Sequence, residues 1–285
     1  MDRVFDGIGE LRNRGPVGFA RTVTEYGLLR SPLSNVILRN LYWKVAPRYY
    51  RWRWSHPKGY IAPLDPFKII WVSPNKIKRF SRRQYPQDAN ATQLFGSVKS
   101  GEWDQRSDIS TRQGYNGTPA YLYHADSFED TIIHQSIKQR FVHGTPWAET
   151  AIVSEAQSLL DSGQRYWRGC ESEAAIHHRC QEIENLYSHI SNEGYQTQFE
   201  LLKQGKIRHV GFLNALANEI LVDIGRDGDF LFANARHRLS IAKILDLDEI
   251  PVVVLVRHEE WMNKRDKVYS GELNTNHPDM KDLCR

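Results

Sequence analysis

The C-terminal third of the chain carries the pattern that most restricts the possible folds. Short apolar runs at 219–224, 230–233 and 251–257 have the length of β-strands. The turn residues of 225–229 predict a hairpin between the first two strands, and an amphipathic segment over about 235–246 predicts a helix before the third. Strands and a helix in this order predict an α+β fold.

The rest of the chain is expected to add one strand and several helices. Residues 67–72 form an apolar run bounded by prolines, which predicts a strand. Apolar residues at helical spacing predict helices over 127–141, near 148–162 and over 171–193, the last ending at Gly194. Residues 81–170 are rich in turn residues, and we interpret them as a helical, partly irregular insertion.

One segment of this insertion, GSVKSGEWD at 96–104, resembles a phosphate-binding loop only in its glycine spacing. It lacks the Lys-Ser or Lys-Thr pair that such a loop needs, so we predict a turn. Trp103 and Asp104 within this segment are candidates for lining a pocket. The alternative is that Trp103 is a buried anchor of the segment.

Composition places the chain among globular proteins. Its 285 residues are 40% hydrophobic and 25% charged, and no apolar run has the length of a membrane span or a signal peptide, so we expect a cytoplasmic protein. Cys170, Cys180 and Cys284 show no C-x-x-C spacing, which predicts reduced thiols. Cys170, His177, His178 and Cys180 match no zinc module, and we predict no metal site.

Positive charge is concentrated at the N-terminus. Residues 1–83 contain 17 Lys and Arg against 5 Asp and Glu, a net charge of +12, and the remainder has a net charge of −8. We expect a basic helical arm over 1–58, with a helix starting near Ser31 and Pro32, and a second domain over 59–285. The candidate contacts of the arm with nucleic acid or a membrane are Arg48, Arg51, Trp52, Arg53 and Trp54. The alternative is that this mixture covers an apolar surface of the same chain.

The segment Asn234–Arg238 lies between a predicted strand and the first turn of a predicted helix. A helix start favours anions, and Arg236, His237 and Arg238 there predict a phosphate-binding pocket shaped by Asn234. The alternative is that Arg238 or His237 pairs with a nearby acid such as Asp223 or Asp227 and organises the turn.

The order strand, turn, strand, A-R-H-R, helix and I-P-V resembles the signature of the ParB/sulfiredoxin-like fold, in which G-x-H-R or G-E-R-R opens the helix. Residues 69–80 (IIWVSPNKIKRF) are similar to the opening strand of ParB N-terminal domains, and 186–201 (LYSHISNEGYQTQFEL) to their helix and next strand. The resemblance implies a core formed by strands at 67–72 and within 186–261, with the insertion at about 81–170. The whole chain also resembles a group of proteins from haloarchaea, which implies an archaeal origin.

Departures from the two family patterns bear on catalysis. Arg236 stands where sulfiredoxins carry their catalytic cysteine and where ParB proteins carry the glutamate of G-E-R-R, so sulfinic-acid reduction and rapid CTP hydrolysis are not expected. Phosphotransferase or nucleotidase activity would need another base, for which Glu193, Asp223 and Asp227 are the candidates.

The sequence thus predicts a protein that binds a nucleotide or another phosphorylated ligand at 234–238, with little or no turnover. A nucleoside triphosphate with Mg is the expected cofactor. Two alternatives stay open, a DNA-associated, partition-like protein that uses the basic arm and a peripheral accessory protein of an anionic membrane surface. No helix-turn-helix pattern follows Trp261, which weakens the first alternative.

Overall fold

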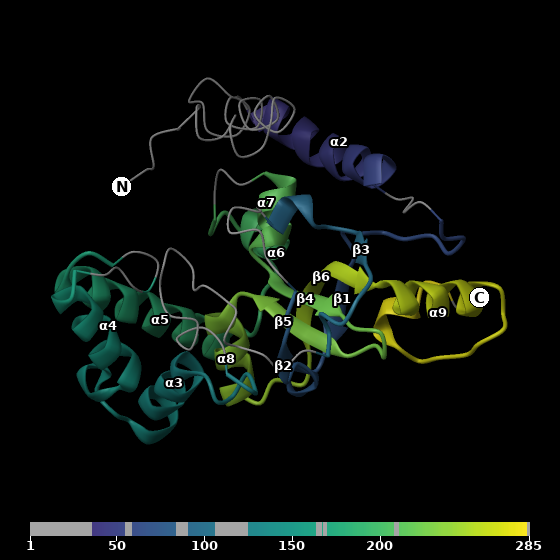
Figure 1. Cartoon of the computed structure of the whole chain (residues 1–285). Coiled ribbons are helices and arrows are strands. Elements are labelled where there is room, and N and C mark those ends of the chain that lie inside the picture. The colour runs from purple at the N-terminus through teal and green to yellow at the C-terminus, as the bar shows by residue number, and fades with distance from the viewer. Residues whose placement is uncertain are drawn as a thin grey trace.

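A mixed, six-stranded β-sheet forms the centre of the computed structural model, which describes residues 36–54, 59–83, 91–105, 125–163, 167, 170–207 and 211–283 (Figure 1). The strands are β1 (Ile69–Val72), β2 (Arg79–Phe80), β3 (Ser97–Lys99), β4 (Ile220–Ile224), β5 (Phe230–Asn234) and β6 (Ile250–His258). Their order is β1-β6-β4-β5-β2, and β3 pairs with the far end of β6.

β6 is the central strand, and its nine residues are all buried. It pairs antiparallel with β1 and parallel with β4 and β3. The run of Val, Ile and Leu in β4 and β6 suits strands covered on both faces. β4 and β5 form the predicted antiparallel hairpin, and its turn needs Gly228, because a Cβ there would come within 2.7 Å of the Trp261 ring at a φ of +93°.

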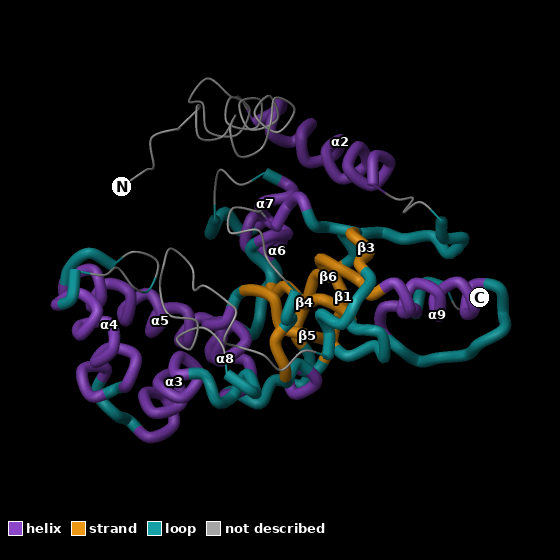
Figure 2. Tube along the Cα trace, in the orientation of Figure 1, coloured by secondary structure: helices purple, strands orange, loops and turns teal. Residues whose placement is uncertain are grey.

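Helices cover both faces of the sheet (Figure 2). They are α2 (Val36–Trp54), α3 (Ile132–His143), α4 (Ala151–Asp161), α5 (Glu173–Glu193), α6 (Gln198–Lys203), α7 (Phe212–Ala217), α8 (Arg236–Ile244) and α9 (Glu259–Tyr269). α8 and α9 contribute to the core on one face, and α7 and α2 contribute to the core on the other. α3, α4 and α5 pack against α8 in a third apolar cluster. The α+β prediction is therefore confirmed.

Short connections fix how the helices of that third cluster begin and end. Thr131 caps α3 by accepting the His134 N–H, and Ser172 caps α5 by accepting the Ala175 N–H. Gly194 ends α5 at a φ of +77°, as predicted from the sequence. These ends place the residues after α5 beside the start of α8.

Two sequence predictions are wrong in detail. Ser97–Lys99 is not part of a turn but strand β3, so a portion of the expected insertion belongs to the sheet. Residues 198–203 form helix α6 rather than a strand, because Thr197 and Glu200 make a reciprocal capping box. Within the predicted helical arm, α2 continues through Pro47 to Trp54, so the aromatic and basic segment is part of the helix. Ser31 and Pro32 lie outside the described residues.

The C-terminal segment is held by a buried ionic network. Asp279 accepts hydrogen bonds from Arg257 (2.6 and 3.0 Å), Arg265 (3.1 Å) and Trp261 Nε1 (3.0 Å), and all three charged side chains are buried. Burial alone would raise the pKa of Asp279, but the charge and hydrogen bonds of Arg257 outweigh it and lower the pKa. The network therefore joins β6, α9 and the segment around Pro278–Met280.

Candidate anion-binding site at the start of helix α8

Helix α8 begins directly after β5, through one residue in an unusual conformation. Ala235, the N-cap residue, has a φ of +73° and supplies no side-chain cap. The first turn, Arg236 to Arg238, contains no acidic residue. The positive end of the helix dipole is therefore neither capped nor neutralised by a side chain of its own first turn.

Three basic residues in this first turn oppose the usual arrangement of charge on a helix. Cations stabilise the C-terminal end of a helix and cost about 0.3–1 kcal/mol each at the N-terminal end. Arg236 and Arg238 occupy the unfavourable end of α8, and His237 adds a third positive charge there when it is protonated. An anion bound there would reverse this cost, because the dipole and the guanidinium groups would then act in the same direction.

Arg238 faces a buried glutamate at the start of β4. Its Nη1 atom lies 4.0 Å from Oε2 of Glu219, whose side chain is 0% exposed. Neither atom has a hydrogen-bond partner among the described residues. The two opposite charges are thus separated by a gap wider than a hydrogen bond, and 21% of the Arg238 side chain is accessible to a ligand.

Burial dominates the acid-base behaviour of Glu219. It raises the pKa of Glu219 to about 7, although the hydrogen bond from the Gln198 N–H (2.6 Å) and the charge of Arg238 lower it. Burial also raises the pKa of the neighbouring Tyr195 hydroxyl, against the effect of Arg238. A carboxyl group with this pKa can accept or release a proton near neutral pH.

His237 is turned toward α5 rather than toward Glu219. Trp167 Nε1 donates to its Nε2 atom (3.3 Å), and Nη2 of Arg179 lies 3.3 Å from its Nδ1 atom. Both neighbours are donors, and a neutral imidazole has one acceptor nitrogen, so it can satisfy one of them. Arg179 also brings a further guanidinium group to the start of α8.

The structure distributes the predicted site residues over several places. Asn234 is an exposed residue at the end of β5, next to the Arg236–Arg238 turn. Glu193 lies at the end of α5, where it pairs with Lys206 and with His189 (3.1 Å). Asp227 is exposed in the hairpin turn and pairs with Lys264 (3.3 Å).

Asp223 is enclosed within the sheet. It accepts from Ser81 Oγ (2.5 Å), from Nε and Nη2 of Arg83 (2.9 and 3.2 Å) and from the Val256 N–H (3.1 Å). The sequence suggested Asp223 or Asp227 as a partner of Arg238, but neither of them faces Arg238. The acid that faces Arg238 is Glu219, which sequence reasoning missed. The available signal was an acidic residue opening the otherwise apolar run of 220–222.

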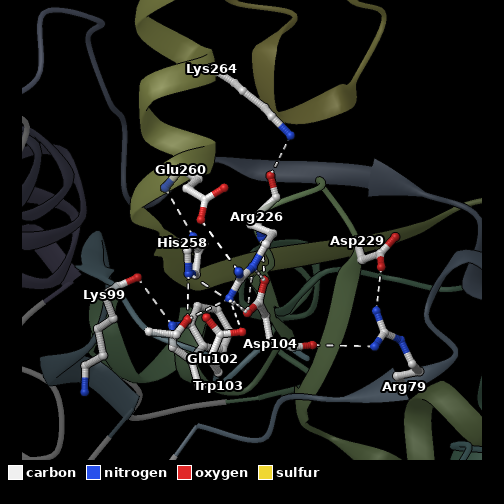
Figure 3. Close-up of polar contacts among 11 residues, drawn as sticks. Arg79, Lys99, Glu102, Trp103, Asp104, Arg226, Asp229, His258, Glu260 and Lys264 are labelled. Carbon is white, nitrogen blue, oxygen red and sulfur yellow. Dashed lines mark hydrogen bonds and ion pairs between the residues drawn. The ribbon is translucent and has the colours of Figure 1, made fainter. Parts of the chain in front are cut away.

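A second polar cluster surrounds Arg226 in the hairpin turn (Figure 3). Arg226 donates to both carboxylate oxygens of Asp104 (2.9 and 3.0 Å) and pairs with Glu102 (3.1 Å). Burial raises the pKa of Asp104, but the hydrogen bonds from Arg226 outweigh it and lower the pKa. His258 uses one ring nitrogen toward Gly101 O (2.8 Å) and the other toward the Glu260 N–H (3.1 Å).

A small pocket of about 170 Å³ lies beside this cluster. Asp104 lines it, as the sequence suggested, together with the Arg79–Asp229 ion pair (2.6 Å). Trp103 is a buried anchor whose Nε1 atom donates to Lys99 O (3.3 Å). Because its charges are paired, this cluster joins the 101–104 segment to the hairpin turn, and it offers less to a ligand than the start of α8.

The candidate contacts of the basic arm lie on α2. Arg48 and Trp52 are exposed, and Arg51 pairs with Asp65 (2.9 Å). The side chains of Arg53 and Trp54 are not among those that the structure describes. No helix of the described residues combines the length and apolar character needed to cross a bilayer.

Comparisons with protein-family models, with curated proteins and with solved structures returned no match.

Proposed function

We propose that the chain binds a nucleotide or another phosphorylated ligand at the start of α8, with little or no turnover. The observation that carries the proposal is the first turn itself, where three basic residues follow an N-cap without a capping side chain. This arrangement costs stability in the absence of an anion and is corrected by one.

Within this proposal, Arg238 is the main contact. Its Nη1 atom is buried, has no hydrogen-bond partner among the described residues and faces a carboxylate too distant to bond. A phosphate oxygen at the accessible part of this side chain would accept a charge-assisted hydrogen bond from the guanidinium group. Arg236 would add a second guanidinium group, and Asn234 would border the ligand from the end of β5.

The low turnover follows from the residue at 236. Arg236 occupies the position at which the resemblance to ParB proteins and sulfiredoxins implies a glutamate or a cysteine. Slow phosphotransferase or nucleotidase activity, with a nucleoside triphosphate and Mg, would need a proton acceptor near Arg238. Glu219 is the acid that the geometry favours for this role, since its pKa is about 7.

Calorimetric titration with CTP, ATP, GTP and pyrophosphate in the presence of Mg tests the proposal. We expect binding of at least one of these ligands, weakened about tenfold or more in Arg238→Ala through loss of a charge-assisted hydrogen bond. Arg238→Lys keeps the charge and should be intermediate. Arg79→Ala removes an exposed arginine from a different ion pair and is the matched control.

Two results would contradict this function. Unchanged affinity in Arg236→Ala and Arg238→Ala, with melting temperatures close to that of the parent chain, would remove the site from α8. Rapid hydrolysis that disappears in Arg238→Ala would keep the site but refute the low turnover. A Glu219→Gln variant that loses this hydrolysis would identify the base.

A further inference from the structure

Helix α2 has one face that packs on the body of the protein. Tyr42 Oη accepts a hydrogen bond from the Phe212 N–H (2.8 Å), and Tyr50 stacks on the Phe212 ring at 5.6 Å. Trp43 contacts Phe199 edge to face, and Ala46 is buried in the same cluster. These contacts hold α2 on the outside of α7, at the periphery of the molecule (Figure 1).

The opposite face of α2 exposes a continuous apolar stripe. Leu41, Val45, Tyr49 and Trp52 are 55%, 52%, 51% and 76% exposed. At 3.6 residues per turn these positions fall within about 80° of arc. Tyr49 and Trp52 also contact each other, with ring centroids 6.4 Å apart. The stripe is therefore a coherent surface and not a set of scattered apolar residues.

Basic side chains border this stripe on one side. Lys44 and Arg48 are exposed and follow the stripe along the helix, while Arg51 is directed to Asp65. The whole of α2 contains five Lys and Arg and no acidic residue. A surface that combines an aliphatic and aromatic stripe with a purely basic border is complementary to the headgroup region of an anionic bilayer.

We propose that the outer face of α2 binds the surface of an anionic lipid bilayer. Leu41, Val45 and the aromatic rings enter the boundary between headgroups and acyl chains, and Lys44 and Arg48 contact lipid phosphates. A nucleic-acid backbone would use the basic border but would leave Leu41 and Val45 in water, so the stripe favours the bilayer. The inner face of α2 packs on the body of the protein, so binding of α2 would hold the rest of the chain at the bilayer surface.

Vesicle co-sedimentation of the full chain tests this proposal. We expect binding to phosphatidylcholine vesicles that contain phosphatidylserine, and much weaker binding to phosphatidylcholine alone. Leu41→Gln with Val45→Gln should lower the partition coefficient about tenfold or more, because the apolar contact is lost. Lys44→Gln with Arg48→Gln should weaken binding to the vesicles that contain phosphatidylserine and leave the weak binding to pure phosphatidylcholine vesicles unchanged. Val142→Gln, at an exposed apolar position of α3, is the matched control.

Several outcomes would overturn it. Absence of sedimentation with anionic vesicles, or unchanged binding in the Leu41 and Val45 variant, would refute insertion of the stripe. Light scattering that shows a dimer dissociated by this variant would assign the face to a second copy of the chain. A lower melting temperature of the variant would assign it to packing within the chain. Binding of labelled duplex DNA that depends on the stripe would assign it to nucleic acid.

Discussion

Two buried acids, Asp279 and Glu219, differ in how they contact the arginines that face them. Asp279 receives hydrogen bonds from Arg257, Arg265 and Trp261, and these lower its pKa. Glu219 receives one hydrogen bond, from Gln198, and faces Arg238 across 4.0 Å, so burial raises its pKa. In the first case two buried arginines contact the acid directly, although Arg257 Nη1 and Arg265 Nε have no hydrogen-bond partner among the described residues. In the second case the facing atoms of Glu219 and Arg238 do not bond, and they lie beside a helix start, as expected of a binding site.

Removing Asp279 from its buried network should have the largest effect on stability. Asp279→Ala leaves Arg257 and Arg265 buried without their common partner, which should lower the free energy of unfolding by about 3–5 kcal/mol. Urea denaturation of the variant and the parent chain measures this loss. Asp282→Ala, which removes an exposed partner of Lys68, should change stability by less than about 1 kcal/mol. Equal losses in both variants would contradict the distinction between the buried network and the surface pair.

The two acids should also give the stability opposite dependences on pH. Folding lowers the pKa of Asp279. Its contribution to the free energy of unfolding is therefore complete above its unfolded pKa and is lost as the pH falls from there toward its folded pKa. The pKa of Glu219 rises from 4.5 to about 7, so its contribution is complete below pH 4.5 and is lost as the pH rises toward 7. At 1.36 kcal/mol per pKa unit, the second effect is on the order of 3 kcal/mol.

Glu219→Gln isolates that second effect. The neutral amide keeps the shape of the side chain, so the loss of stability between pH 4.5 and 7 should disappear, and stability at pH 7 should equal or exceed that of the parent chain. Unfolding measured at several pH values in both proteins decides this. A variant that is less stable than the parent chain at pH 8, where Glu219 is ionised, would show that Glu219 and Arg238 form a stabilising ion pair despite their separation.

The fold was most predictable where the determining interactions are local. The hairpin, α8 and β6 lie within two residues of their predicted ends, because apolar runs and turn residues there agree with the tertiary arrangement. β3 was missed because its three residues pair with Val256, Arg257 and His258, far along the chain. Such a short strand has no periodicity of its own, and its partner alone defines it.

The candidate site was predictable only in part for a similar reason. The first turn of α8 could be identified from its basic residues and its place after a strand. Glu219 could not be assigned to it, because the approach of Gln198 and Tyr195 from the segment after α5 buries it. Asp223 was expected near the site, but a register shift between β4 and β6 lets its carboxylate accept the Val256 N–H inside the sheet.

The charge of Glu219 should also affect the affinity of the proposed site. With glutamine at 219, Arg238 loses its competing carboxylate, and a bound phosphate no longer lies near a buried negative charge. We therefore expect Glu219→Gln to increase the affinity for the ligand at pH 8 by about 0.5–1.5 kcal/mol, and to have less effect at pH 5, where Glu219 is protonated. Calorimetry at both pH values measures the difference. Equal affinities of the parent chain and Glu219→Gln at pH 8 would show that Glu219 does not act on the bound ligand.

The smallest expected effect concerns the backbone that links strand and helix. Ala235 has a φ of +73°, where residues with a Cβ atom are disfavoured by about 1–2 kcal/mol and glycine is not. Glycine also has more conformational freedom in the unfolded chain, which offsets part of this gain, so Ala235→Gly should raise the free energy of unfolding by about 0.5–1 kcal/mol. Ala233→Gly, in the neighbouring strand, is the matched control and should lower it. Because the substitution keeps the conformation at the start of α8, affinity for the ligand should be unchanged, and a loss of affinity would show that the methyl group of Ala235 shapes the site.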